Sequence, residues 1–222
     1  MGNGRCIIIG AGDFTLSEIE KKKEDLCIAV DGGYLYCKLL AIEPDFLIGD
    51  MDSIDESMKE EIEEIKSRNP GKVIELNTEK DDTDALAAIK LGIEKGYETF
   101  LIYGAMGGRL EHTIANIQCL SYLKNNGKKG YMMDANVMVT VIKDESVKFA
   151  KSMDGYLSLF ALGKEAKGVT IKGMKYLLDQ ITVTNDYPIG ISNEFIGEEG
   201  EITVEEGMLL LIVTWNEEEQ EA

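Results

Sequence analysis

The feature that most constrains the fold is an alternation of short apolar runs with helical patterns over the first 134 residues. Six runs have the length and apolar content of buried strands: residues 5–10, 26–30, 46–49, 72–76, 99–103 and 131–133. Between several of them lie patterns with helical spacing, such as Leu86, Ile89 and Ile93. This alternation predicts a mostly parallel sheet covered by helices on both faces, a three-layer α/β/α domain.

The pattern changes near Ala135, where short β-branched segments begin to follow one another with turn residues between them. The segments are residues 137–142, 156–161, 169–171, 180–184, 201–204 and 208–214. No long helical pattern intervenes, which predicts an antiparallel β-sandwich. We therefore expect an α/β domain over residues 1–134 and a β-sandwich domain over residues 135–222 that ends in a short acidic tail.

The chain is strongly acidic, with 41 Asp and Glu against 23 Lys and Arg and a formal net charge of −18. This balance argues against binding nucleic acid, whose affinity depends largely on cationic contacts to phosphate. A phosphate-bearing substrate would also be repelled, unless metal ions and helix N-termini supply local positive charge.

Three further features bear on where the protein works. No apolar run approaches the roughly 20 residues that span a bilayer, so we expect no membrane partner. The N-terminal residues MGNGRCIIIGAG lack the basic start and apolar stretch of a secretion signal. The four cysteines are far apart and form no CxxC motif, which indicates neither a zinc site nor a disulfide framework. We expect a cytoplasmic protein.

Four polar loops follow predicted strands of the first domain: residues 31–33, 49–53, 80–84 and 104–112. In a parallel sheet, ligands bind beyond the carboxyl ends of the strands. Any one of these loops could be ordinary turn chemistry. Their common placement predicts a ligand site at one edge of the sheet.

The loop Gly49-Asp50-Met51-Asp52-Ser53 carries two acids separated by one residue. If the chain stays extended there, both carboxylates leave on one side with Cα atoms about 6.5–7 Å apart. That spacing suits one or two hard cations bound by carboxylate oxygens. Asp and Ser also gather in turns without any metal, so turn chemistry remains the alternative.

The other loops have structural alternatives too. Asp81, Asp82 and Asp84 stand at a predicted helix N-terminus, where the helix dipole favours acids, and Thr83 can be part of the cap. Residues 104–108 include three glycines, which allow the backbone to approach a ligand and expose amides that can cradle phosphate.

Three charged or titratable residues follow these glycines. Arg109 and Glu111 can form a surface ion pair that contributes little. His112 is the single histidine and stands in the first turn of a predicted helix; without a Cys or second His nearby it does not indicate zinc. Earlier in the chain, Gly10-Ala11-Gly12 resembles a dinucleotide fingerprint, but Thr15 replaces its third glycine and breaks the match.

In order and spacing, the combined motifs resemble those of the thiamine pyrophosphokinase family. They are Asp31-Gly32-Gly33, Pro44-Asp45 with Gly49-Asp50-Met51-Asp52-Ser53, Lys80-Asp81-Asp82-Thr83-Asp84, Gly107-Gly108-Arg109-Leu110-Glu111-His112 with Asn116, and Gly190-Ile191-Ser192-Asn193-Glu194. The resemblance implies an α/β domain followed by a β-sandwich, in a homodimer that binds thiamine between its subunits. It also implies transfer of a pyrophosphoryl group from ATP to the thiamine hydroxyl, with release of AMP.

The resemblance assigns roles residue by residue. It implies that Asp50, Asp52 and Asp84 bind Mg²⁺, with Asp81 and Arg109 completing the catalytic group. The implied nucleotide contacts are Asp31, Gly32, Gly33, Lys80, Thr83, Gly107, Gly108, Arg109, Glu111, His112 and Asn116; the implied thiamine contacts are Ser192, Asn193 and Phe195. Two positions depart from the family pattern: Met51 stands where Phe is usual, and Glu111 stands where bacterial members usually have Asp.

Electrostatics agrees with this interpretation, since ATP and a carboxylate cluster repel each other unless Mg²⁺ intervenes. Arg109, then Lys80, is the cation expected to stabilise charge on the transferred phosphate. Asp84 and Asp81 both remain candidates for receiving the hydroxyl proton. Thiamine is itself a cation, which an acidic site with an aromatic wall would favour. Three alternatives stay open: a pyrophosphoryl transferase that uses a pterin alcohol, a Mg²⁺-dependent nucleotide-sugar transferase, and a sensing module that binds without turnover.

Overall fold

The computed structural model describes residues 4–16, 18–50, 56–76 and 82–216, and the chain divides into two compact units, Met1–Asp134 and Ala135–Ala222. The elements of the first unit are β1 (Cys6–Ile9), β2 (Leu26–Val30), α1 (Gly33–Leu39), β3 (Phe46–Gly49), α2 (Glu56–Arg68), β4 (Val73–Glu75), α3 (Asp84–Glu94), β5 (Thr99–Tyr103), α4 (Leu110–Asn125) and β6 (Lys129–Asp134). None of the described helices is long and apolar enough to cross a membrane.

The strands of the first unit form a parallel array in the order β6-β5-β1-β2-β3-β4. Strands β1 to β4 are neighbours in sequence order, whereas β5 pairs with the side of β1 that lies opposite β2. The order of the strands therefore reverses between β1 and β5. In open α/β sheets, this reversal is the place where ligands bind.

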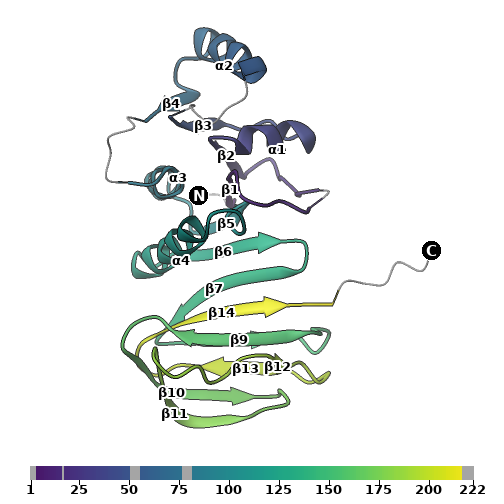
Figure 1. The fold of residues 1–222 in the computed structure, drawn as a ribbon, viewed down its shortest axis with the longest axis vertical. Coiled ribbons are helices and arrows are strands. Elements are labelled where there is room, and N and C mark those ends of the chain that lie inside the picture. Colours follow the sequence, from purple (N-terminus) through teal and green to yellow (C-terminus); the bar gives the residue numbers. More distant parts are fainter. Residues whose placement is uncertain (1–3, 17, 51–55, 77–81, 217–222) are drawn as a thin grey trace, which may run out of the picture. The chain divides into compact units, whose positions relative to one another are not determined.

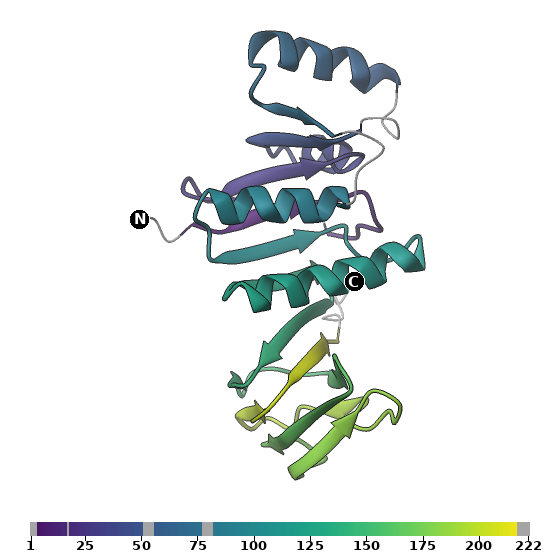
Figure 2. The same ribbon diagram turned by 90° about the vertical axis from the view of Figure 1, so that its left-hand side faces the viewer.

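Both faces of this array are covered by helices. On one face, Tyr34 and Cys37 of α1 and Ile62 of α2 share a buried cluster with Ile7 and Cys27 of the strands. On the other face lie the buried side chains of α3 and α4, and Gly92 of α3 packs directly against Cys6 and Phe100. Figure 1 shows α1 on one side of the strands with α3 and α4 on the other, and Figure 2 shows α3 in front of them. The predicted three-layer α/β/α domain is confirmed.

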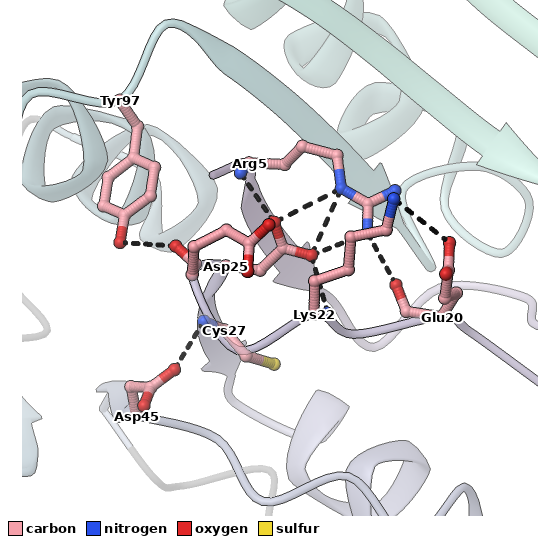
Figure 3. A network of polar contacts seen from close by, with 8 residues as sticks. Arg5, Glu20, Lys22, Asp25, Cys27, Asp45 and Tyr97 are labelled. Carbon is pink, nitrogen blue, oxygen red and sulfur yellow. Dashed lines mark hydrogen bonds and ion pairs between the residues drawn. The ribbon is translucent and has the colours of Figure 1, made fainter. Parts of the chain in front are cut away.

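The amino ends of β1 and β2 are joined by a charged network (Figure 3). The Asp25 side chain is 1% exposed and forms an ion pair of 2.6 Å with Arg5. The same carboxylate accepts hydrogen bonds from the backbone N–H groups of Arg5 (2.7 Å) and Lys22 (2.9 Å). Asp45 accepts a bond of 2.8 Å from the N–H of Cys27, which ties the start of β3 to β2.

The second unit contains β7 (Val137–Lys143), β8 (Ser146–Phe149), β9 (Tyr156–Ala161), β10 (Glu165–Lys172), β11 (Leu178–Thr184), β12 (Asn193–Glu194), β13 (Gly200–Thr203) and β14 (Met208–Thr214). They form two antiparallel arrays, β12-β9-β14-β7 and β11-β10-β13-β8.

One buried cluster joins the two arrays of the second unit. Leu159 and Leu211 from the first array pack with Val169, Ile171 and Ile202 from the second. Cores of this kind, built from the inner faces of two sheets, are typical of a β-sandwich. The predicted antiparallel β-sandwich is confirmed, although β8 and β12 were not predicted because such short segments carry little apolar alternation.

Candidate functional site

A cavity of about 500 Å³ lies at the carboxyl ends of β1, β2 and β5, where the strand order reverses. It is lined by residues 10–13 after β1, 30–31 after β2, 83–85 at the start of α3, 104–105 and 107–109 after β5, and 112, 115 and 116 of α4. Three of the four polar loops singled out in the sequence therefore contribute to one cavity. The expectation that these loops share an edge of the sheet is met for their described residues.

The chain segments that follow β1 and β5 are hydrogen-bonded to each other. The N–H of Gly10 donates to the carbonyl of Tyr103, and the N–H of Gly12 donates to the carbonyl of Gly104, each at 2.8 Å. An added Cβ on Gly10 would lie 2.8 Å from the Gly104 oxygen, so a residue without a side chain is needed here. This pairing builds the floor of the cavity from backbone rather than from bulky side chains.

Asp31 directly follows β2, where the chain leaves the sheet, and has a left-handed backbone conformation with φ of 47°. Its N–H donates to the carbonyl of Ile48 (2.9 Å), and its carbonyl accepts from the N–H of Tyr34 (3.2 Å), the start of α1. The Asp31 carboxylate lies against Gly49, where an added Cβ would come within 1.7 Å of Oδ1. Asp31 therefore links the first two polar loops, 31–33 and 49–53. Asp50 is the last described residue of the second.

The start of α3 brings Thr83 and Asp84 to the cavity. Thr83 is the N-cap, and its hydroxyl oxygen accepts from the N–H of Leu86 at 3.2 Å. The helix dipole favours the Asp84 carboxylate in the first turn. Asp82 instead forms an ion pair with Lys90 of the same helix.

The start of α4 contributes Arg109, His112 and Asn116 to the lining. The Arg109 Nε donates to Glu111 at 2.7 Å, in a pair whose side chains are 73% and 64% exposed. Hydrogen bonds from its own backbone N–H and from Arg109 lower the pKa of Glu111. Asn116 donates from Nδ2 to the carbonyl of Ala105 at 2.9 Å, which fixes the loop after β5.

The magnesium site stays a prediction. Asp52, Lys80 and Asp81 lie outside the described residues, and Asp50 and Asp84 are described. Within the described ranges, no group of three His, Cys, Asp or Glu side chains forms a metal-binding cluster. Asp31 and Asp84 do line one cavity, and carboxylate oxygens are the donors that suit Mg²⁺.

The three predicted thiamine contacts belong to the second unit and have partners there. Asn193 is 2% exposed; its Oδ1 accepts from the N–H of Tyr176 (2.9 Å) and its Nδ2 donates to the carbonyl of the same residue (2.6 Å). The Ser192 N–H donates to the Ser158 hydroxyl at 3.0 Å, with Ser192 at φ of 54°.

Phe195 packs at a tilt against Phe149, with ring centroids 5.6 Å apart. Phe195 is therefore partly a core residue of the second unit. The Asn193 contacts likewise have a structural role, because they tie β12 to Tyr176 in the segment between β10 and β11. Thiamine contact by Ser192, Asn193 and Phe195 stays a prediction.

Comparison with models of known protein families shows which family the chain belongs to. Residues 18–132, more than half of the chain, match the model of the thiamin pyrophosphokinase catalytic domain. The chain belongs to the thiamin pyrophosphokinase family. Residues 141–209 match the model of the thiamin pyrophosphokinase vitamin B1 binding domain, in the second unit. The predicted family and the prediction that the chain is an enzyme are confirmed.

Individual relatives of the thiamin pyrophosphokinase family agree with this assignment. The chain is 29% identical over 188 residues to a thiamine pyrophosphokinase of Bacillus subtilis, covering 84% of this chain and 86% of the relative. It is 26% identical over 179 residues to thiamine pyrophosphokinase 1 of Oryza sativa, covering 77% and 66%. A crystal structure of Bacillus subtilis thiamine pyrophosphokinase matches with a TM-score of 0.83 at 27% identity, over 97% of this chain and 100% of that chain.

Part of the cavity was not predicted. Residues 10–13, including Asp13, line it together with Ala85 and Ala115. The available signal is the Gly10-Ala11-Gly12 turn after a predicted strand, although Thr15 breaks its match to a dinucleotide fingerprint. The turn contributes to the cavity through its backbone groups, and a sequence fingerprint detects residue types rather than backbone contacts.

Proposed function

We propose that this chain transfers a pyrophosphoryl group from ATP to the hydroxyl of thiamine in a Mg²⁺-dependent reaction that gives thiamine diphosphate and AMP. The observation that carries the proposal is the cavity at the strand reversal, in a chain that belongs to the thiamin pyrophosphokinase family. Its backbone-lined floor and the N-termini of α3 and α4 are the features that bind phosphate groups in α/β proteins.

The proposed nucleotide side is formed by the residues that line the cavity. Thr83 and Arg109, the N-cap residues of α3 and α4, and His112 of α4 line a cavity of about 500 Å³, within the range of small-molecule sites. Arg109 is paired with Glu111 at the surface. An ATP phosphate would compete with this carboxylate for the guanidinium, whose planar fork suits phosphate oxygens.

The proposed metal ligands are Asp50, Asp52 and Asp84. Bound Mg²⁺ would supply positive charge between the carboxylates and the phosphates. The chain's own groups would orient ATP, and Asp84 or Asp81 would accept the proton from the thiamine hydroxyl. Arg109, with Lys80, would stabilise the charge that develops on the transferred group.

The proposed thiamine side lies in the residues around Ser192, Asn193 and Phe195, which fall within the part of the chain matching the vitamin B1 binding domain. A homodimer with thiamine between subunits belongs to the same proposal. So does a cytoplasmic location, where ATP and Mg²⁺ are available.

A direct assay tests the reaction. The protein, ATP, Mg²⁺ and thiamine are mixed, and the products are identified by mass spectrometry. We expect AMP and thiamine diphosphate in equal amounts, and no product when EDTA replaces Mg²⁺. ADP with thiamine monophosphate would contradict pyrophosphoryl transfer. Turnover with a pterin alcohol but not with thiamine would favour the related transferase, and saturable binding without AMP would favour a sensing module.

A pair of variants on one helix tests the assigned site. Asp84→Asn removes a proposed metal ligand at the start of α3, and Glu94→Gln removes an exposed carboxylate at its end. We expect Asp84→Asn to reduce kcat by about 10²–10³-fold, the loss typical of removing a group that stabilises transition-state charge. Glu94→Gln should retain full activity. Equal activity of the two variants would contradict the role of Asp84.

A further inference from the structure

Asp13 has contacts that the sequence motifs do not assign. It follows the Gly10-Ala11-Gly12 turn and lines the same cavity as Arg109. Its Oδ2 accepts a hydrogen bond from the backbone N–H of Gly108 at 3.2 Å. Its own N–H donates to the carbonyl of Met106 at 2.9 Å. Asp13, in the segment that follows β1, therefore contacts the glycine-rich loop after β5 through both its side chain and its backbone.

The carboxylate of Asp13 also fits closely against the loop. An added Cβ on Gly107 would come within 2.0 Å of Asp13 Oδ2, so the oxygen lies directly over this glycine. Gly107 and Gly108 have φ values of 74° and 60°, a left-handed conformation that glycine adopts without strain. The two glycines allow the loop its left-handed backbone conformation, and Asp13 contacts the loop at these same two residues. Because glycine has no side chain to restrict its backbone, an outside contact is needed there to hold one conformation.

The segment that carries Asp13 is itself firmly held. The Tyr36 hydroxyl donates to the carbonyl of Gly12 at 3.1 Å, and the Tyr36 ring stacks on Phe14 at 4.6 Å. On the other side of Asp13, the N–H and hydroxyl of Thr15 donate to the Asp134 carboxylate at 3.2 and 2.8 Å. Asp13 is therefore presented to the loop from an anchored stretch of chain.

The loop is also held from α4, but through different atoms. Asn116 donates to the carbonyl of Ala105, and the Thr113 hydroxyl donates to the carbonyl of Gly107 at 3.4 Å. These helix side chains engage carbonyl groups, whereas the Asp13 carboxylate engages an N–H group. The side chains on the two sides of the loop therefore bind opposite polar groups of its backbone.

We propose that Asp13 is a positioning residue that fixes the Gly107-Gly108 loop in the conformation that receives the phosphates of the nucleotide. The inference rests on the proposed function for its nucleotide. Without the acceptor, the loop would populate other conformations and the binding-competent fraction would fall. The apparent affinity for the nucleotide falls by that fraction.

Three variants test the proposal: Asp13→Ala removes the acceptor, Asp13→Asn keeps an acceptor oxygen without the charge, and Glu18→Ala removes an exposed charge from the same connection. We expect Asp13→Ala to raise the Kd of Mg²⁺-ATP, measured by calorimetry, by about 3- to 10-fold, the equivalent of one hydrogen bond. KM for ATP should rise similarly, with kcat and KM for thiamine nearly unchanged. Asp13→Asn should restore most of the affinity, and Glu18→Ala should match the unmodified protein.

Amide exchange of Gly108, followed by NMR on the ligand-free protein, measures the contact separately. It should accelerate in Asp13→Ala and be restored in Asp13→Asn. Nucleotide binding in Asp13→Ala as tight as in the unmodified protein, or tighter, would overturn the proposal. Equal weakening in Asp13→Ala and Asp13→Asn would also overturn it, because the charge would then matter rather than the hydrogen bond. Neither the calorimetric Kd nor the amide exchange requires thiamine, so failure to form thiamine diphosphate would contradict the proposed function without affecting these two results.

Discussion

The two edges of the parallel array in the first unit are built on opposite principles. At the amino ends of β1 and β2, the chain buries the Asp25 carboxylate, pairs it with the partly buried Arg5 and surrounds it with hydrogen-bond donors. At the carboxyl ends, it uses glycines and backbone pairing and leaves a cavity of about 500 Å³. Asp25 at the first edge is 1% exposed, while both members of the Arg109–Glu111 pair at the second edge are mostly exposed.

This difference teaches where stability and function are concentrated. A buried ion pair satisfied by several hydrogen bonds is costly to break but binds nothing else. A backbone-lined cavity with acidic and basic side chains around it can accept a ligand. Substitutions at the amino edge should therefore change stability without changing KM, and substitutions at the carboxyl edge should change ligand binding.

The largest effect on stability is expected for Asp25→Ala. Removing the carboxylate leaves Arg5, whose side chain is 25% exposed, without its ion pair. We expect a loss of about 3 kcal/mol in the free energy of unfolding, at the lower end for breaking a buried pair. Urea denaturation measures it. Glu20→Ala, which removes an exposed partner of Lys22, should change stability by less than about 0.5 kcal/mol. Similar losses in both variants would contradict the comparison.

The same carboxylate predicts how stability depends on pH. Burial by itself would raise the pKa of Asp25, but hydrogen bonds from Arg5 and from the N–H of Lys22 outweigh it and lower the pKa. Its contribution is therefore complete above the unfolded value, about 3.9, and is lost as the pH falls through the lowered pKa. Below about pH 4, the free energy of unfolding should fall less steeply in Asp25→Asn than in the unmodified protein. Equal slopes would show that Asp25 is not a major acid-sensitive group.

A pair of glycine substitutions compares a position where an added Cβ would clash with one where it would meet no other atom. Gly104 and Gly127 have φ of 59° and 69°, but an added Cβ would lie 2.4 Å from the Gly10 oxygen at the first and meet nothing within 4 Å at the second. Gly127→Ala should cost about 1 kcal/mol from backbone strain. Gly104→Ala should cost about 1–2 kcal/mol more from the clash, and it should weaken ATP binding. Thermal unfolding measures the cost and calorimetry measures ATP binding; equal costs would contradict the close approach of the segments that follow β1 and β5.

The cap of α3 should have a smaller effect. Thr83→Val keeps the shape and removes the hydroxyl that accepts from Leu86, with an expected loss of about 1 kcal/mol. Thr83→Ser keeps the hydroxyl and should restore most of that stability. Urea denaturation of both variants decides whether the cap, rather than the β-branched shape, is responsible.

The smallest effect on stability is expected for Glu111→Gln. The pair with Arg109 is exposed to solvent, so the urea midpoint should not change measurably. In Glu111→Gln, Arg109 would lose the carboxylate that competes with phosphate for its guanidinium. Glu111→Asp keeps a carboxylate and should retain activity if a carboxylate alone is needed. A marked fall in the urea midpoint of Glu111→Gln would show that this edge depends on ion pairs as the amino edge does.

Much of the fold follows from local patterns. Residues 26–30, 99–103, 156–161 and 208–214 were predicted as strands and are strands with those bounds, because buried strands are short apolar runs that end at turn residues. The change from helix-linked to turn-linked strands predicted an α/β domain followed by a β-sandwich. Motif order predicted the family, which the match over residues 18–132 confirms.

The rest of the site depends on contacts between segments far apart in the sequence. The sequence by itself determined the elements and the polar loops after Val30 and Tyr103, since hydrophobic spacing and turn residues act locally. The tertiary structure alone decided that β5 pairs with β1, that Asp13 reaches Gly108, and that Asn193 bonds internally to Tyr176. Pairing of strands and hydrogen bonds to backbone atoms leave no periodic trace in the sequence, because any residue supplies a backbone N–H or carbonyl group at those positions except proline, which lacks the N–H.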